Sequence, residues 1–149
     1  MIQHIKDSAE AVGIEAVITN SEQKIEVQLN SLTRDDDRPI MLVSWDIDTT
    51  ISFDEHGLMN NPEMSIVALL VEKAPDLTKV ELENTAEEMA DLFKLFLQDL
   101  YRRLIPVQRS LRQPITNATY KYVPKHGAGK HSGVLAKWNQ YTGIINCKV

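Results

Sequence analysis

The sequence predicts an α+β protein, in which a mainly antiparallel sheet packs on one long helix and a short second helix stands at the N-terminus. Two observations carry this prediction. One amphipathic segment of helical period runs without a break over residues 85–105, and short apolar segments of strand length lie on both sides of it. Strands joined by hairpin-length connections around one helix are typical of α+β architecture. The 149 residues suffice for a single domain, 1–149, with a substantial core.

The long helix is predicted from Thr85 to Ile105. Its apolar residues recur at three- and four-residue spacing and form one stripe. We expect the centre of that stripe to be buried against the sheet, namely Phe93, Phe96, Leu97 and Leu100. Thr85 and Glu88 have the spacing of a capping box, which predicts the start, and Pro106 predicts the end. Leu92 and Leu95 widen the apolar stripe, so a second partner such as another subunit could contact this helix.

The N-terminal part predicts one short helix and weak strands. Apolar residues at helical spacing run from Ile2 to Val12, and Gly13 follows them as a glycine commonly follows a helix. In residues 14–18 and 25–29, apolar side chains recur at every second position, which is the period of a half-buried strand.

Two strands with stronger patterns enclose a polar arm. The strand from Pro39 to Trp45 has apolar residues on both faces, which predicts cover on each side or contact with another subunit. The strand from Ser65 to Val71 is continuously apolar, as expected of a central strand. Residues 46–62 between them are largely polar and predict an extended arm, so we expect the two strands to pair antiparallel.

A hairpin is predicted after the long helix. Residues from Ile115 to Val123 form its first predicted strand, with Tyr120 and Tyr122 on one face. The glycine-rich residues 124–133 predict a flexible tip. The closing strand or strands are predicted over 134–138 and 141–149.

Charge is distributed unevenly along the chain, whose formal net charge is −5. Residues 1–99 hold all 21 acidic residues and seven basic ones, which is a net charge of −14. Residues 100–149 hold nine basic residues and no acidic one. This asymmetry leaves four arrangements open: contact with nucleic acid, contact with an acidic protein surface, head-to-tail self-association of acidic with basic surfaces, and neutralisation within one sheet.

No pattern in the sequence predicts catalysis, a cofactor or a metal ion. The stretch from Gly127 to Gly133 lacks the first glycine and the Ser or Thr of a phosphate-binding loop, and a strand-like segment follows it. The acidic residues between 35 and 55 match no calcium-loop spacing, and the dispersed histidines match no zinc site. A metal-dependent nuclease is therefore the least favoured of the function classes that we considered.

The composition also argues against a membrane or secreted protein. No apolar run reaches the roughly 20 residues of a membrane-spanning helix. The N-terminus has neither the basic nor the apolar region of a signal peptide. Cys147 is the only cysteine, so no intrachain disulfide can form, which fits a reducing compartment.

The C-terminal third interleaves basic and aromatic residues, which is the composition of a nucleic-acid-binding face. The residues concerned are Lys121, Lys125, Lys130 and Lys137, with Tyr120, Tyr122 and Trp138. Their alternation favours an ordinary hairpin, with the aromatic side chains in the core and the lysines outside. A small nucleic-acid-binding protein that uses this basic third remains the alternative function, and we expect such binding to be weak and non-specific.

Four stretches carry a resemblance to a known family: RPIMLVSW (38–45), SIVALLVEKAPD (65–76), FLQDLYRRLI (96–105), and NATYKY with HSGVLAKWNQYTG (117–122 and 131–143). In this order they are similar to the tail terminator and tail-completion proteins of long-tailed bacteriophages. The resemblance implies a structural subunit without enzymatic activity, which forms a ring, commonly a hexamer, that ends the tail tube and joins it to the head. It also implies as partners further copies of the chain, the tail tube protein and head–tail connector proteins. The expected location is the tail or neck of a virion, assembled in the host cytoplasm.

Such a ring requires a heterologous interface, in which two different surfaces of each subunit meet around a closed circle. We expect charge to select the partner and apolar side chains to hold the ring together, because exposed ion pairs contribute little. Trp45, Met41, Leu92 and Leu95 are candidates for the apolar contacts. The candidates for the charged contacts are Asp46, Asp48, Asp54 and Glu55 on the acidic side, and Arg102, Arg103, Arg109 and Arg112 on the basic side.

Overall fold

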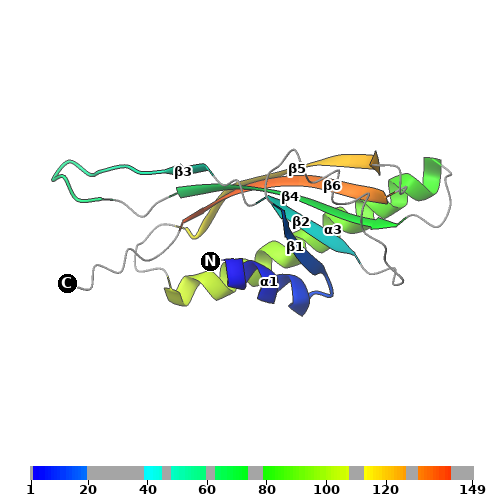
Figure 1. The fold of residues 1–149 in the computed structure, drawn as a ribbon, viewed down its shortest axis with the longest axis horizontal. Helices are drawn as coiled ribbons and strands as arrows, with labels where there is room; N and C mark the ends of the chain where they lie inside the picture. Colours follow the sequence, from blue (N-terminus) through cyan, green and yellow to red (C-terminus); the bar gives the residue numbers. More distant parts are fainter. Residues whose placement is uncertain are drawn as a thin grey trace.

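The structure is a computed structural model that describes residues 2–19, 39–44, 48–59, 63–73, 79–107, 113–126 and 131–141. This part of the chain forms two α-helices and a six-stranded, mostly antiparallel sheet (Figure 1). The predicted α+β class is therefore confirmed. In chain order the elements are α1 (Ile2–Ala11), β1 (Glu15–Thr19), β2 (Ile40–Ser44), β3 (Asp48–Thr50), β4 (Glu63–Lys73), α3 (Lys79–Leu104), the 3-10 helix η2 (Ile105–Val107), β5 (Ile115–His126) and β6 (His131–Tyr141).

The sheet has the strand order β1-β2-β4-β6-β5, and the short β3 pairs with the beginning of β4. Strands β2 and β4 are antiparallel, as predicted, with Met41 opposite Leu70. Strands β4 and β6 pair over their whole length, from Glu63 opposite Tyr141 to Lys73 opposite His131. The N-terminal β1 joins the edge beside β2 and runs parallel to it. The two strands with the strongest apolar patterns thus lie inside the sheet, where both of their edges are paired.

Both helices lie on the same face of the sheet (Figure 1), and α3 crosses β4, β5 and β6. Aromatic rings fill the space beneath α3. The centroid of the Trp138 ring on β6 lies 5.7 Å from that of Phe96 and 5.9 Å from that of Phe93. Phe93, Phe96 and Leu100 are buried, as the apolar stripe predicted. Leu97 is only partly buried, because it stands at the margin of the stripe.

Helix α3 begins at Lys79, six positions before the predicted start. The prediction that a capping box at Thr85 starts the helix is therefore wrong. Thr85 is instead a buried residue in the second turn of the helix. The earlier residues contain no helix breaker, and Leu82 continues the apolar stripe into the core. The hydroxyl of Ser132 on β6 donates a hydrogen bond of 2.5 Å to the Leu82 carbonyl, which ties this first turn to the sheet. The predicted end is correct to one residue, because α3 ends at Leu104 before Pro106.

Helix α1 ends as its sequence predicted, at a glycine with a left-handed backbone. Gly13 has φ +82°, and its amide donates to the Glu10 carbonyl at 3.0 Å. The amide of Ile14 donates to the Ala9 carbonyl at 2.8 Å. These two bonds define a Schellman motif, which turns the chain sharply and places Ile14 in the same core as Ala9.

The opposite face of the sheet is also apolar at its centre. Ile40 and Leu42 of β2 are buried there beside Leu69 and Val71 of β4. All five residues of β2 are buried, so the structure supports cover on each side, the first of the two predicted alternatives. Neither of the two described helices lies over this second face (Figure 1).

The C-terminal hairpin is longer than predicted, because β5 continues to His126 and β6 begins at His131. An irregularity between Thr116 and Thr119 interrupts the pairing of β5 with β6. Asn117, which lies within it, has φ 52°, a conformation that asparagine tolerates better than most residues. The closing strand is continuous to Tyr141. The predicted strand over 25–29 and the end of the predicted closing strand, 142–149, lie outside the described residues.

Candidate interaction surfaces

The first candidate surface is a hairpin arm that continues the sheet beyond its own end. Strand β3 pairs with the first residues of β4, with Thr50 opposite Glu63. Beyond β3 the chain leaves the body of the molecule, and an isolated bridge joins Phe53 to Met59 (Figure 1). We call residues 49–59 the arm. Every side chain in it is exposed.

Asp54 folds the tip of the arm. One oxygen of its carboxylate, Oδ1, accepts hydrogen bonds from the backbone amides of His56 at 2.8 Å and Leu58 at 2.9 Å. The Asp54 amide also donates to the Leu58 carbonyl at 2.8 Å, and Gly57 adopts φ +78°. The carboxylate thus stabilises the turn, as aspartate side chains do when they bond to following amides. Its neighbour Glu55 projects into solvent, where its only described polar contact is His56 at 3.5 Å.

The arm carries more apolar surface than a solvated hairpin needs. The side chain of Phe53 is 64 % exposed and that of Leu58 is 67 % exposed. Ile51 and Met59 are exposed as well. Single exposed apolar residues are ordinary, but four of them within one short projecting element are typical of a contact surface.

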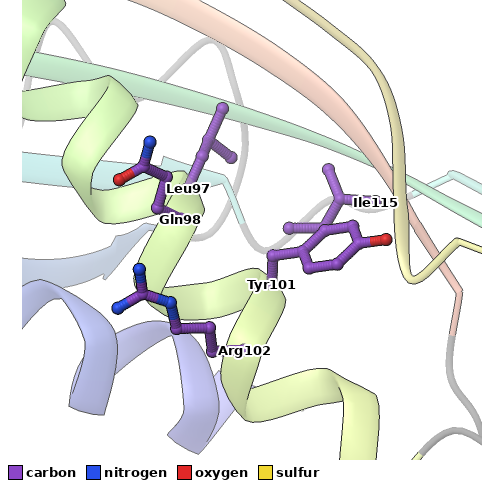
Figure 2. Close-up of a pocket in the computed structure, with 5 residues that line it drawn as sticks. All are labelled: Leu97, Gln98, Tyr101, Arg102 and Ile115. Carbon is purple, nitrogen blue, oxygen red and sulfur yellow. The ribbon is translucent and has the colours of Figure 1, made fainter.

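The second candidate surface is an open pocket of about 410 Å³ at the C-terminal end of α3 (Figure 2). The described residues of its lining come from two successive turns of α3 and from the first residue of β5. These residues are Leu97, Gln98, Tyr101, Arg102 and Ile115. The Tyr101 ring reaches across towards Ile115, which closes the apolar side of the pocket (Figure 2). We call this feature the α3–β5 pocket.

Arg102 and Arg103 are neighbours in sequence but have different surroundings. The Nε of Arg103 donates a hydrogen bond of 2.6 Å to Asp99, one turn earlier on α3. This bond is the main reason why the pKa of Arg103 is raised and that of Asp99 is lowered. Arg102 instead lines the α3–β5 pocket, exposed to solvent. The side chain of Arg103 is therefore bonded within its own helix. Arg102 also contributes to the lowered pKa of Asp99, but it forms no such bond to another described residue.

The predicted interface residues are thus placed unevenly. Four of them are exposed, namely Asp54, Glu55, Arg102 and Arg103. Asp48 is the first residue of β3. Trp45, Asp46, Arg109 and Arg112 lie outside the described residues. Met41 is fully buried beneath the helices, so it is not accessible to a second subunit, whereas Leu92 is only partly buried against the same core. Leu95, at 53 % exposure, is the accessible part of the predicted spare helix face.

The basic and aromatic residues of the C-terminal hairpin separate onto the two faces of the sheet. Trp138 is buried beneath α3, and Tyr120 packs against the same core. Lys121 and Lys137 are exposed and alternate with these aromatic positions along their strands, so they point to the opposite face. Together with Thr119, Tyr120 and Leu135 they line a second hollow, of about 250 Å³. The buried Trp138 therefore offers the lysines no stacking platform, and Tyr120 is the aromatic residue that borders the same hollow.

The sequence predicts the arm and the arginines, but it does not predict the pocket between the end of α3 and β5. The pocket depends on Ile115 meeting the end of α3, and these residues are separated by the chain after Pro106, so no local pattern signals the contact. Within the described ranges, no three His, Cys, Asp or Glu side chains are grouped as a metal site. Neither described helix is both long and apolar enough to span a membrane.

The comparisons with known proteins add no assignment to this geometry. No model of a protein family matches the chain, and no curated protein matches it significantly.

Proposed function

We propose that this protein is a structural component of a phage tail, which associates into a closed ring at the end of the tail tube and joins it to the head. The observation that carries the proposal is the exposed arm with its group of apolar side chains, Ile51, Phe53, Leu58 and Met59. The arm packs against no part of the described core, which is consistent with a role outside its own subunit.

A second feature supports a ring in particular. The arm and the α3–β5 pocket are different surfaces on different elements, one acidic at its tip and the other bordered by Arg102. Association through two unlike surfaces is heterologous, and it closes into a ring when the rotation between subunits divides a full turn. The resemblance of the sequence to tail terminator proteins supports a position at the tail end for such a ring.

A tube-assembly experiment tests the proposal. Purified tail tube protein from the same phage is polymerised with and without the chain, and tube lengths are measured by electron microscopy. We expect shorter tubes that carry a ring of added density at one end. Tubes of unchanged length with bare ends would contradict the function.

Nucleic-acid binding is the second candidate, and the hollow lined by Lys121, Lys137 and Thr119 is the observation that favours it. Binding through phosphate contacts releases counterions, so the affinity would fall steeply as salt is raised. We expect weak binding of a DNA duplex that Lys121→Ala and Lys137→Ala each reduce. Submicromolar binding at physiological salt would make this candidate the main function.

A further inference from the structure

We propose that the tip of the arm of one subunit docks into the α3–β5 pocket of a second copy of the same chain. The inference rests on the proposed function, because it assigns the contact through which the ring would close. It names one occupant for the pocket, the segment from Phe53 to Leu58 of the neighbouring copy, and one charged contact, between Glu55 of that copy and Arg102.

The apolar parts of the two surfaces suit one another. The arm offers Phe53 and Leu58 as large exposed side chains on either side of a tight turn. The pocket offers the side chains of Leu97, Tyr101 and Ile115. A volume of about 410 Å³ lies at the low end of the roughly 300–1,000 Å³ typical of ligand pockets. It is therefore a suitable size for one or two side chains of a turn.

The charges are complementary as well. Oδ1 of Asp54 is bonded to two amides of its own turn, which fixes this side chain, so Glu55 is the carboxylate that the tip presents more freely. Arg103 is occupied by Asp99, so Arg102 is the guanidinium available at the pocket. Arginine is suited to such a contact, because its planar donors match a carboxylate and its pKa keeps it charged.

The rigidity of the turn also favours this contact over a docking segment that must first fold. The Asp54 carboxylate and Gly57 hold the tip in one conformation before any partner binds. A preformed loop loses less conformational entropy on binding, which leaves more of the contact energy for affinity. The arm points away from its own subunit (Figure 1), so the copy that it reaches must be another molecule.

A charge-reversal cycle on the full-length chain tests the contact. We would compare the wild type with Glu55→Arg, Arg102→Glu and the double variant, and measure the dissociation constant of self-association by sedimentation velocity. Each single reversal should weaken self-association about tenfold or more, because two like charges then face each other. The double variant should return to within about threefold of the wild type, because the pair is restored in reverse.

Matched controls separate docking from folding. Leu58→Ala should also weaken association, whereas Val80→Ala, which removes an equally exposed apolar side chain at the far end of α3, should not. Arg103→Glu should have a much smaller effect than Arg102→Glu, because Arg103 does not line the pocket. Circular dichroism should show that every variant is folded, as expected for exposed positions.

The outcomes distinguish this inference from the proposed function. Arm docking would be overturned if the wild type forms rings and the single reversals do not weaken self-association. It would also be overturned if the double reversal does not restore self-association. Both outcomes would leave ring formation intact. An effect of Arg102→Glu on binding of the tail tube protein alone would assign the pocket to a different partner, and would overturn the inference too. A wild type that stays monomeric at every concentration would contradict both.

Discussion

Arg103 donates to Asp99 across one turn of α3, with 2.6 Å between Nε and Oδ2. This pair distinguishes two arginines that are adjacent in the sequence, because Arg102 has its side chain at the pocket instead. The ion pairs along α3 are local in the same way: Lys79 with Glu83, Lys94 with Asp91, and Arg103 with Asp99. Local pairs of this kind stabilise the helix modestly, and none of these three joins α3 to the arm of the same subunit.

The Asp99–Arg103 pair predicts a pH dependence. The Arg103 hydrogen bond holds the pKa of Asp99 below its ordinary value of about 3.9, so the folded state binds this proton less readily than the unfolded state. The pair's contribution is therefore complete above that ordinary value and is lost as the pH falls through the lower folded pKa. We expect the difference in unfolding midpoint between the wild type and Asp99→Asn to shrink between about pH 5 and pH 2. A difference that grows on acidification would refute the assignment.

The core beneath α3 predicts a large effect of one substitution. Phe96 is fully buried and its ring lies 5.7 Å from that of Trp138, so Phe96→Ala should lower the free energy of unfolding by roughly 3–5 kcal/mol. The adjacent Leu95 is 53 % exposed, so Leu95→Ala should change it by only about 0.5 kcal/mol. Urea titration of both variants measures the contrast. Equal midpoints for the two would show that α3 does not cover the core.

Asp54 predicts a local change that its amide analogue should avoid. Asp54→Ala removes the acceptor of the His56 and Leu58 amides, so hydrogen exchange at these two amides should accelerate. Asp54→Asn keeps a side-chain oxygen in the same place and should retain most of the protection. The global unfolding midpoint should move little in either variant, because the arm is exposed. If the His56 and Leu58 amides exchange as fast in the asparagine variant as in the alanine variant, the side-chain oxygen of residue 54 does not stabilise the turn.

Gly133 predicts that a single methyl group disturbs the sheet. A Cβ at this position would overlap the Leu70 carbonyl oxygen of β4. The backbone must shift to admit it, and overpacking of this kind costs about 1–3 kcal/mol. The midpoint of thermal unfolding should therefore fall clearly in Gly133→Ala. It should hardly change in Lys137→Ala, which alters an exposed position of the same strand. A Gly133→Ala midpoint equal to that of the wild type would mean that the two strands are not so close.

The sequence predicted the fold well where side-chain periodicity is set by burial. The stripe of α3 and the continuous apolar run of β4 both reflect contact with one core, so each pattern was legible in a single segment. The start of α3 was misplaced because the local capping signal at Thr85 competes with a tertiary contact, the bond from Ser132 to Leu82. The irregularity near Asn117 likewise breaks the alternation that strand prediction depends on.

The candidate site could be predicted only in part. Charge placed acidic residues on the arm and arginines at the end of α3, but it could not tell Asp54 from Glu55 or Arg102 from Arg103. These distinctions depend on hydrogen bonds to specific backbone and side-chain atoms, which the residue type alone does not determine. The α3–β5 pocket depends on two elements that meet only in the folded chain.

The mass of the assembled protein in solution tests the central claim most directly. Light scattering at low and moderate salt should give one defined species whose mass is a small whole multiple of the 16.9 kDa chain, commonly six in such rings. The affinity between subunits should fall as salt is raised, because charge contributes to partner selection. The assembly should nevertheless persist, because apolar side chains hold the contact. A monomer at all concentrations, or open-ended growth without a fixed mass, would contradict ring formation.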